Sequence, residues 1–196
     1  MMNKAEKTRQ FIIEKTAPIF NVKGFAGTSI NDMIQATGLT KGSIYGNFRN
    51  KDDVALAAFD HNLKMVHKVI RHEMDSKDSV KEKLMVYVNV YSNFLEFPFP
   101  DGGCPILNTS TEADDTHPEL RQKAADAIMQ WKSNLQALIK KGMDDREFHA
   151  DTDPEQMALT IIAMIEGGIM MAKVTGKLNY RNAVMKSIKK MIDDLG

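Results

Sequence analysis

The stretch GFAGTSINDMIQATGLTKGSIYGNFRNKDDV, residues 24–54, decides the fold of the N-terminal part of the chain. A short helix is expected to begin after Thr28 or Ser29, because a Ser or Thr oxygen accepts a hydrogen bond from the free amides of a first helical turn. Gly38 ends that helix, since glycine readily adopts a left-handed backbone. Thr40 begins a second short helix. The pattern therefore predicts two short helices that cross steeply, as a helix-turn-helix requires.

These two short helices, residues 30–36 and 41–47, are expected to pack through one apolar face and to leave a second face open. The inner face consists of Ile30, Met33, Ile34, Leu39, Ile44 and Phe48. The outer face of the second helix is small, polar or basic, which suits a DNA major groove about 12 Å wide. Gly42 and Gly46 each destabilise a helix by about 1 kcal/mol relative to Ala. Their presence favours close approach of the helix backbone to a partner.

The charge of the chain is unevenly distributed, although its net value is zero. Residues 1–51 contain eight Lys and Arg residues against three acidic ones, an excess of five positive charges. The rest of the chain carries an equal excess of negative charge. A basic end on an otherwise acidic chain is expected if that end alone contacts a polyphosphate.

At these residues the chain resembles the TetR/AcrR family of transcriptional regulators. The resemblance covers roughly residues 9–56. It rests on a first helix ending in Lys-Gly-Phe, then Thr-Ser-Ile, a Thr-Gly-Leu turn, Gly-Ser-Ile-Tyr, a Phe three residues later, and Lys-Asp. The resemblance implies that the second short helix lies in the major groove of double-stranded operator DNA. The chain departs from the family pattern at Asn47, where the family most often has His; this change is expected to alter specificity more than function.

The same resemblance implies which side chains contact DNA. Thr28, Tyr45 and Lys51 match positions that hold phosphates. Lys41, Ser43 and Gly46 match positions near base edges. The complete predicted DNA-binding set is Thr28, Thr40, Lys41, Gly42, Ser43, Tyr45, Gly46, Asn47 and Lys51.

Helical patterns dominate the whole chain, and convincing strand alternation is absent. The helices expected outside the two short ones cover residues 4–23, 51–74, 78–97, 105–113, 118–142, 154–174 and 179–195. Pro18 is expected to kink the first of these and Gly24 to end it, whereas Thr116 and Pro118 begin the helix at 118–142. The sequence therefore predicts an all-α fold of about nine helices. Residues 1–50 form a three-helix helix-turn-helix domain, and residues 51–196 form a larger helical domain for effector binding and dimerisation.

A homodimer built from the last two helices is a further implication of the resemblance. Residues 157–174 and 183–195 each present Met, Ile, Ala and Leu at helical spacing. Gly167 and Gly168 would let two helices approach closely. The alternative is that these faces are buried within one chain. A dimer would read two half-sites about 34–36 Å apart, so its operator would be an approximate palindrome.

The resemblance also implies that an unidentified small molecule binds in the larger domain. The residues proposed to line its pocket are Tyr87, Tyr91, Phe94, Cys104, Trp131, Leu135, Met164 and Met171. A stripe of aromatic and Met residues at helical spacing is more often ordinary core than a binding site, and both interpretations stay open. A mostly apolar pocket favours a hydrophobic or amphipathic effector.

Cys104 is the single cysteine of the chain and lies in Gly-Gly-Cys-Pro, where a helix is expected to begin. Helix N-termini favour the thiolate form of a cysteine. The segment GGCPILNTSTEADDTHPELR also resembles the Gly-Cys segment of a family branch that includes repressors responsive to N-ethylmaleimide and other electrophiles. Two interpretations follow: a sensing thiol, or a buried Cys that packs a turn.

Patterns typical of enzymes are absent from the sequence. The five His residues form no HExxH pair, and there is no Gly-rich phosphate loop, nucleophile elbow or Cys-rich metal spacing. The neighbouring carboxylates Glu112, Asp114 and Asp115 are interpreted as capping and loop charges. We therefore expect neither enzymatic activity nor a cofactor.

A protein-interaction adaptor on the same scaffold is the second function considered. The basic N-terminal part and the cluster of Lys41, Tyr45 and Lys51 favour DNA instead, and repression is the family's usual action. No stretch approaches about 18 uninterrupted apolar residues, and the start MMNKAEKTRQ is polar. The protein is therefore expected to be cytoplasmic and not to bind a membrane.

Overall fold

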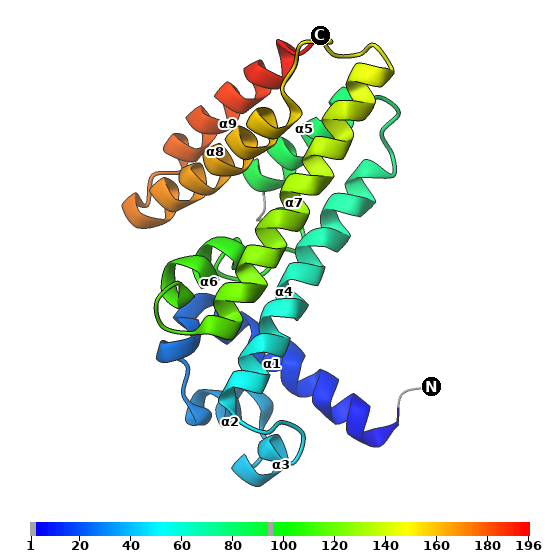
Figure 1. Cartoon of the computed structure of the whole chain (residues 1–196). Helices are drawn as coiled ribbons and strands as arrows, with labels where there is room; N and C mark the ends of the chain where they lie inside the picture. The colour runs from blue at the N-terminus through cyan, green and yellow to red at the C-terminus, as the bar shows by residue number, and fades with distance from the viewer. Residues whose placement is uncertain (1–2, 94–95) are drawn as a thin grey trace. The chain divides into compact units, whose positions relative to one another are not determined.

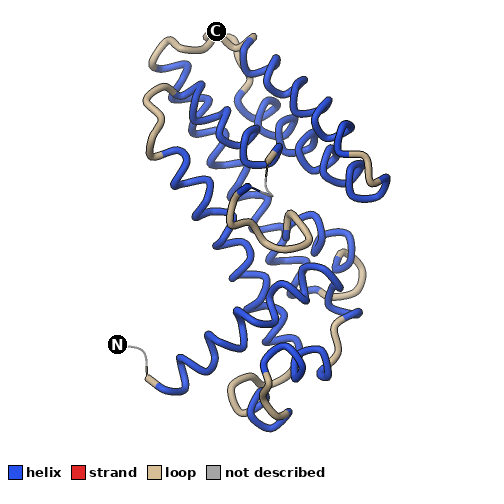
Figure 2. Tube along the Cα trace, turned by 180° about the vertical axis from the view of Figure 1, so that it is seen from behind, coloured by secondary structure: helices blue, strands red, loops and turns tan. Residues whose placement is uncertain are grey.

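The computed structural model describes residues 3–93 and 96–196, and all of the regular elements among them are helices (Figures 1 and 2). The nine described α-helices are α1 (Lys4–Gly27), α2 (Ile30–Thr37), α3 (Lys41–Tyr45), α4 (Lys51–Met74), α5 (Val80–Ser92), α6 (Pro105–Ala113), α7 (Pro118–Asp144), α8 (Pro154–Thr175) and α9 (Leu178–Asp193). The predicted all-α class is confirmed. Most predicted helices occur within a few residues of their predicted bounds.

α5 is the main exception, because it ends at Ser92 and not at the Phe-Pro run that follows. The Ser92 hydroxyl donates to the Val88 carbonyl at 2.6 Å. Asn93 then leaves the helical conformation, with φ −126° and ψ 30°. The predicted pocket residue Phe94 lies outside the described residues.

α1 bends at Gly24 and not at Pro18. Gly24 has φ 73° and ψ 178°, a conformation that L side chains rarely adopt, and one further helical turn continues to Gly27. Pro18 lies inside the helix, where it removes a single backbone donor. The prediction that Pro18 interrupts the helix was wrong, since the backbone keeps helical dihedrals there. Gly24, predicted to end the helix, instead interrupts it, and the helix ends at Gly27.

The two short helices begin at residues that the sequence indicates. The Ser29 hydroxyl oxygen accepts a hydrogen bond from the Asp32 amide, and the Asp32 carboxylate accepts one from the Ser29 amide in return. Gly38 ends α2 in the left-handed conformation, with φ 67°. The Thr40 hydroxyl oxygen caps α3 by accepting from the Ser43 amide at 3.1 Å.

The predicted inner face of this pair of helices is buried as expected. Met33 and Ile44 are completely buried, and Phe48 is nearly so. Ile30, Ile34 and Leu39 are half-buried. The three buried side chains hold α2 and α3 against the rest of their unit and leave the opposite side of α3 free.

α7 begins with a histidine in place of the predicted threonine. The His117 Nδ1 atom accepts a hydrogen bond from the Leu120 amide at 3.2 Å, which caps the first turn. Its Nε2 atom therefore carries the proton and donates to the Asp52 carboxylate at 3.1 Å. The hydroxyl of Thr116 donates instead to the carbonyl of Glu112. The expected starting role of Thr116 was therefore wrong.

Contacts divide the chain into two compact units. One consists of Met1–Val66 with Phe99–Ala125, and the other of His67–Pro98 with Asp126–Gly196. The first unit thus contains α6 as well as the helix-turn-helix. The functional division at residue 50 stays a prediction.

The second unit has an apolar core of its own, in which α8 and α9 lie side by side (Figure 1). Its fully buried side chains include Leu84, Leu135, Ile139, Ile165 and Ile188. α8 is long and apolar enough to cross a membrane by length and composition, with a mean hydropathy of 1.7. Thr160, Glu166 and Lys173 interrupt its apolar run, and 39% of the tested window is buried.

Candidate nucleic-acid interface

The exposed side of α3 brings most of the predicted DNA-binding residues together. Thr40, Lys41, Gly42 and Gly46 are exposed, whereas Ser43, Tyr45, Asn47 and Lys51 are half-buried. We call these eight residues the α3 surface. A Cβ added to Gly42 would come no closer than 3.9 Å to the nearest side chain, the Thr40 hydroxyl. Packing within the chain therefore does not require glycine at this position.

Thr28 does not belong to the α3 surface. Its side chain is completely buried, and its hydroxyl donates to the Gly24 carbonyl at 2.6 Å. This hydrogen bond stabilises the turn between α1 and α2. The implied phosphate contact is not available to the side chain in this conformation, and we leave Thr28 out of the proposed contacts.

Arg9 of α1 contacts the residues that follow α3 and holds them in place, a role that was not predicted from the sequence. Its guanidinium donates to the Asn47 carbonyl at 2.7 Å and lies 3.9 Å from the centre of the Phe48 ring. The Asn47 side-chain amide donates to the Ser43 carbonyl at 2.9 Å. Asn47 is thereby held against its own helix, and one of its amide hydrogens is already used.

Lys51 lies at the first position of α4, beside α3. Its ammonium nitrogen is 4.3 Å from the centre of the Phe25 ring, close enough for a cation–π interaction. The His117 ring also meets the Phe25 ring, edge-on, with 4.5 Å between ring centres. These contacts hold the Lys51 side chain over the Phe25 ring.

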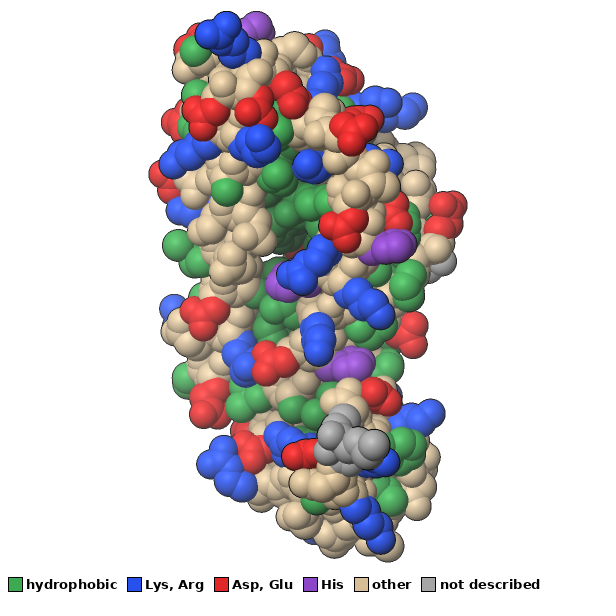
Figure 3. Space-filling model, turned by 90° about the vertical axis from the view of Figure 1, so that its right-hand side faces the viewer, with side chains coloured by type: hydrophobic (Ala, Val, Ile, Leu, Met, Phe, Trp, Pro, Cys, Tyr) green, Lys and Arg blue, Asp and Glu red, His purple; other side chains and the backbone are tan. Residues whose placement is uncertain are grey.

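Two cations of the basic N-terminal part are neutralised by nearby carboxylates. Arg49 makes two hydrogen bonds to Asp53, at 2.7 and 2.6 Å, and these hold the pKa of Asp53 below its usual value. Lys23 donates to Asp32 at 2.6 Å. This bond, aided by Ser29, lowers the pKa of Asp32. The excess of five positive charges over residues 1–51 already subtracts Asp32 but not Asp53, so the Arg49–Asp53 pair lowers the charge available to a polyanion. On the face in Figure 3, acidic and basic side chains are interspersed.

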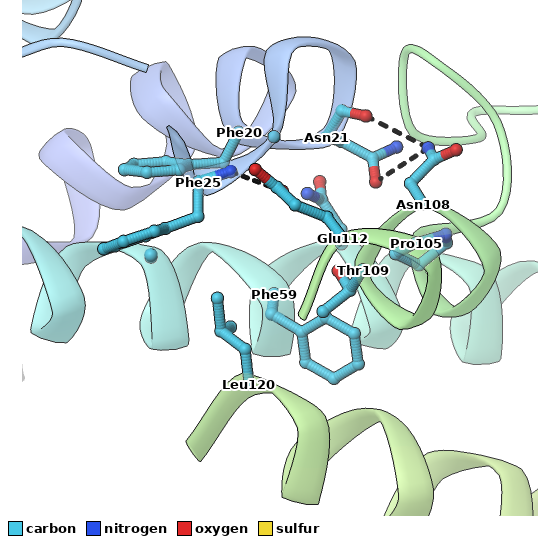
Figure 4. A pocket seen from close by; sticks show the side chains of 12 residues that line it. Phe20, Asn21, Phe25, Phe59, Pro105, Asn108, Thr109, Glu112 and Leu120 are labelled. Carbon is cyan, nitrogen blue, oxygen red and sulfur yellow. Dashed lines mark hydrogen bonds between the residues drawn. The ribbon is translucent and has the colours of Figure 1, made fainter. Parts of the chain in front are cut away.

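Glu112 of α6 connects that helix to the bend in α1 (Figure 4). Its carboxylate accepts hydrogen bonds from the amides of Phe25 and Ala26, at 2.7 and 2.8 Å. These are the first amides after the bend at Gly24. A Cβ at Gly24 would lie 2.3 Å from the Glu112 carboxylate. Glycine at this position allows the backbone conformation and leaves the Glu112 carboxylate in place; a larger residue would force the carboxylate to shift.

A second polar connection joins α1 to α6 and to the loop before α6. The Asn21 side-chain amide donates to the carbonyls of Asp101 and Gly103, at 2.6 and 2.9 Å. The Asn108 side-chain amide donates to the Asn21 and Gly102 carbonyls, both at 3.0 Å. Glu112 was interpreted from the sequence as a capping or loop charge. It does accept hydrogen bonds from backbone amides, but these belong to α1 and not to a neighbouring helix start.

A small cavity lies between α1, α4 and α6 in the same unit (Figure 4). Its lining residues include Phe20, Phe59, Asn62, Thr109 and Glu112. Its volume is about 20 Å³, room for about one water molecule and far less than a drug-sized ligand needs. None of the predicted effector residues lines it.

Four of the predicted effector residues come together in the core of the second unit. Tyr87, Tyr91, Trp131 and Leu135 are all buried there. The Trp131 ring is stacked with Tyr91 at 5.3 Å and with Tyr87 at 6.1 Å between ring centres. Burial raises the pKa of Tyr87 to about 12.

The other described members of the predicted effector set are placed differently. Met164 is half-buried on α8, and Met171 is exposed on the same helix. Cys104 belongs to the first unit, where it is the N-cap residue of α6 and only 1% exposed. Within residues 3–93 and 96–196, no group of three His, Cys, Asp or Glu side chains is placed to hold a metal ion.

Comparison with known proteins identifies the family. The family described as "Bacterial regulatory proteins, tetR family" matches residues 12–58, and "Tetracyclin repressor-like, C-terminal domain" matches residues 80–188. The chain belongs to the TetR family of transcriptional regulators. Members of this family bind operator DNA, and the first match includes α2 and α3.

Solved structures of other TetR regulators agree with this fold along the whole chain. A TetR-family regulator from Cytophaga hutchinsonii is 49% identical, with a TM-score of 0.95 over 100% of this chain and 98% of its own. A TetR regulator from Chloroflexus aurantiacus is 34% identical, with a TM-score of 0.92 over 98% and 97%. The transcriptional repressor DhaR of a Mycobacterium species is 24% identical over 85% of this chain and 82% of its own.

Proposed function

We propose that this regulator is a repressor that binds a near-palindromic operator as a homodimer and leaves it when a small molecule binds. Repression is supported by the resemblance to the repressor DhaR. The observation that carries the DNA contact is the α3 surface. Gly42 is exposed there, and packing within the chain does not require a glycine at this position. An adaptor function would give no reason for a basic, glycine-containing helix at this place.

The α3 surface suits two kinds of DNA contact. Lys41 and Ser43 lie on the short helix that would enter the major groove, and Gly46 is its C-cap residue; all three would lie near base edges. Tyr45 and Lys51 would contact phosphates, and the Lys51 ammonium is already fixed over the Phe25 ring. Asn47, with one amide hydrogen bonded to Ser43, retains its side-chain carbonyl as an acceptor for a base or a bound water.

Mobility-shift titrations of wild type and Gly42→Ala test the DNA contact, using fragments selected from the host genome. Wild-type affinity should fall by roughly a thousandfold or more between about 50 and about 200 mM salt, because phosphate contacts release counterions. Ala is the better helix former by about 1 kcal/mol, so the variant should unfold no earlier than wild type. We expect the variant to bind operator about tenfold more weakly, because the added methyl group keeps the helix from approaching the base edges closely. A base contact is worth about 1–3 kcal/mol, and a tenfold loss corresponds to about 1.4 kcal/mol.

Two results would contradict the proposed DNA contact. Equal operator affinity of wild type and Gly42→Ala would show that the α3 surface does not contact DNA closely. Salt-insensitive binding, or none to any genomic fragment, would favour the adaptor.

The proposed dimer rests on apolar side chains that α8 and α9 leave exposed. Six such residues are between 38% and 81% exposed: Leu159, Met170, Met171, Val174, Leu178 and Tyr180. The two glycines of α8 differ in role. A Cβ at Gly168 would meet the Val184 side chain at 3.3 Å, so Gly168 serves packing within the chain. A Cβ at Gly167 would meet nothing within 4 Å, which leaves Gly167 open to a second copy.

The burial of Cys104 argues against rapid sensing of electrophiles. A thiol that is 1% exposed reacts only when the structure around it opens, whereas sensing thiols are accessible. We expect N-ethylmaleimide to modify the native protein at least about tenfold more slowly than the unfolded chain. Mass spectrometry of timed samples measures both rates. Fast release of operator by N-ethylmaleimide from wild type, but not from Cys104→Ser, would instead establish a sensing thiol.

A further inference from the structure

The cluster formed by Tyr87, Tyr91 and Trp131 contains a hydrogen-bond donor that the protein does not use. Trp131 is 5% exposed, and among the described residues its indole Nε1–H has no acceptor. An indole can donate a hydrogen bond but cannot accept one, so no rearrangement of its own ring satisfies it. A buried donor without an acceptor costs about 1–3 kcal/mol. If residue 131 only packed the core, Phe would serve at a lower free-energy cost, because its ring has no buried N–H group.

The shape of the aromatic cluster limits what can contact it. Tyr87 and Tyr91 lie four residues apart on α5, so they share one face of the helix. Both rings are within about 25° of parallel to the indole, with interplanar angles of 23° and 19°. A ligand that replaces one of these rings against Trp131 must itself be flat. Tyr87 is the more distant neighbour, at 6.1 Å against 5.3 Å, and we expect it to move.

The charge around the aromatic cluster indicates a neutral ligand. The cation next to Trp131 in sequence, Lys132, donates to Glu155 of α8 at 2.7 Å and is therefore already paired. Burial keeps Tyr87 protonated, with a pKa of about 12, so its ring is neutral at physiological pH. A carboxylate or ammonium group buried against these rings would lose its hydration, which costs more free energy than burying a neutral group.

We propose that Tyr87, Tyr91 and Trp131 bind a neutral, planar aromatic effector through ring stacking and through a hydrogen bond from the Trp131 Nε1–H to an acceptor on the ligand. The acceptor is a heterocyclic nitrogen or a ring carbonyl. This inference rests on the proposed function, because it names the chemical class of the releasing molecule. It also explains why a Trp with an unused donor lies in the core.

Quinoline and naphthalene are matched probes for this site, because they have the same shape and differ in one ring atom. Quinoline carries an acceptor nitrogen that is mostly neutral at pH 8, and naphthalene carries none. Trp131 is the single Trp of the chain, so its fluorescence reports directly on the cluster. In titrations of the free wild-type dimer, we expect saturable quenching and about tenfold tighter binding of quinoline.

The variant Trp131→Phe keeps an aromatic ring and removes the donor. Calorimetric titration should show equal binding of the two probes to this variant, provided that circular dichroism confirms its fold. Equal binding of the probes to wild type, no binding of either, or an unchanged preference in the variant would each overturn the site. Binding is measured without DNA, so absent operator binding would overturn the proposed function alone.

Discussion

The variant Val174→Glu is expected to be a monomer that binds operator roughly a hundredfold or more weakly than wild type. Val174 is 81% exposed in the single chain, at the C-terminal end of the apolar surface shared by α8 and α9. In a symmetric dimer such a residue is buried against the partner, and a carboxylate there is desolvated without a counter-charge. A monomer loses the second half-site, and with it an avidity gain of about 10²–10⁴.

Analytical ultracentrifugation and operator titration measure the two effects of Val174→Glu separately. The stability of the single chain should change by less than about 0.5 kcal/mol, because the replaced side chain is exposed there. Met129→Glu is the matched control, since Met129 is a 55% exposed apolar residue on α7, which is not one of the two helices of the proposed face. A dimer that survives Val174→Glu, or one that Met129→Glu disrupts equally, would place the interface elsewhere.

The variant Glu112→Ala should lower the thermal midpoint by about 5–10 °C. It removes both acceptors from the amides of Phe25 and Ala26, directly after the bend in α1. Hydrogen bonds to charged groups contribute about 1.5–3 kcal/mol each, and partial exposure reduces the pair here to about 2–3 kcal/mol in total. For a chain of this size, each kcal/mol shifts the midpoint by about 2–4 °C.

Two further variants separate this connection from a general effect of charge removal. Glu112→Gln keeps one acceptor oxygen and should lose about half as much stability. Asp114→Ala removes an exposed carboxylate two residues along, whose oxygen accepts from the adjacent Asp115 amide, and should change the midpoint little. Equal midpoints for Glu112→Ala and Asp114→Ala would show that the connection to α1 contributes nothing.

Features set by local chemistry could be predicted from the sequence. Ser29, Gly38 and Thr40 determine the bounds of α2 and the start of α3 through hydrogen bonds and dihedrals within a few residues. The start of α8 at Asp153 and Pro154 follows from the same rules. The family resemblance, in turn, was carried by short motifs, and it supplied the function.

Features set by distant contacts could not be predicted. The two amides bound by Glu112 are 87 and 86 residues away in sequence, and the Asp52 partner of His117 is 65 residues away. No local pattern distinguishes Thr116 from His117 as the residue that begins α7. Thr28 was assigned to DNA from its position in the motif, but its burial depends on how α1 bends. The different roles of Gly167 and Gly168 likewise depend on the packing of α9.

The close approach of Glu112 to Gly24 also constrains how this regulator can diverge. Any side chain at position 24 would collide with the carboxylate and would also occupy a backbone conformation with φ 73°. Shortening residue 112 relieves the collision but leaves two amides unpaired. A substitution at either position alone therefore destabilises the connection between α1 and α6, and neither substitution compensates for the other. Gly24 and Glu112 are therefore expected to be retained together among related sequences, or to be lost together where the connection between α1 and α6 is built differently.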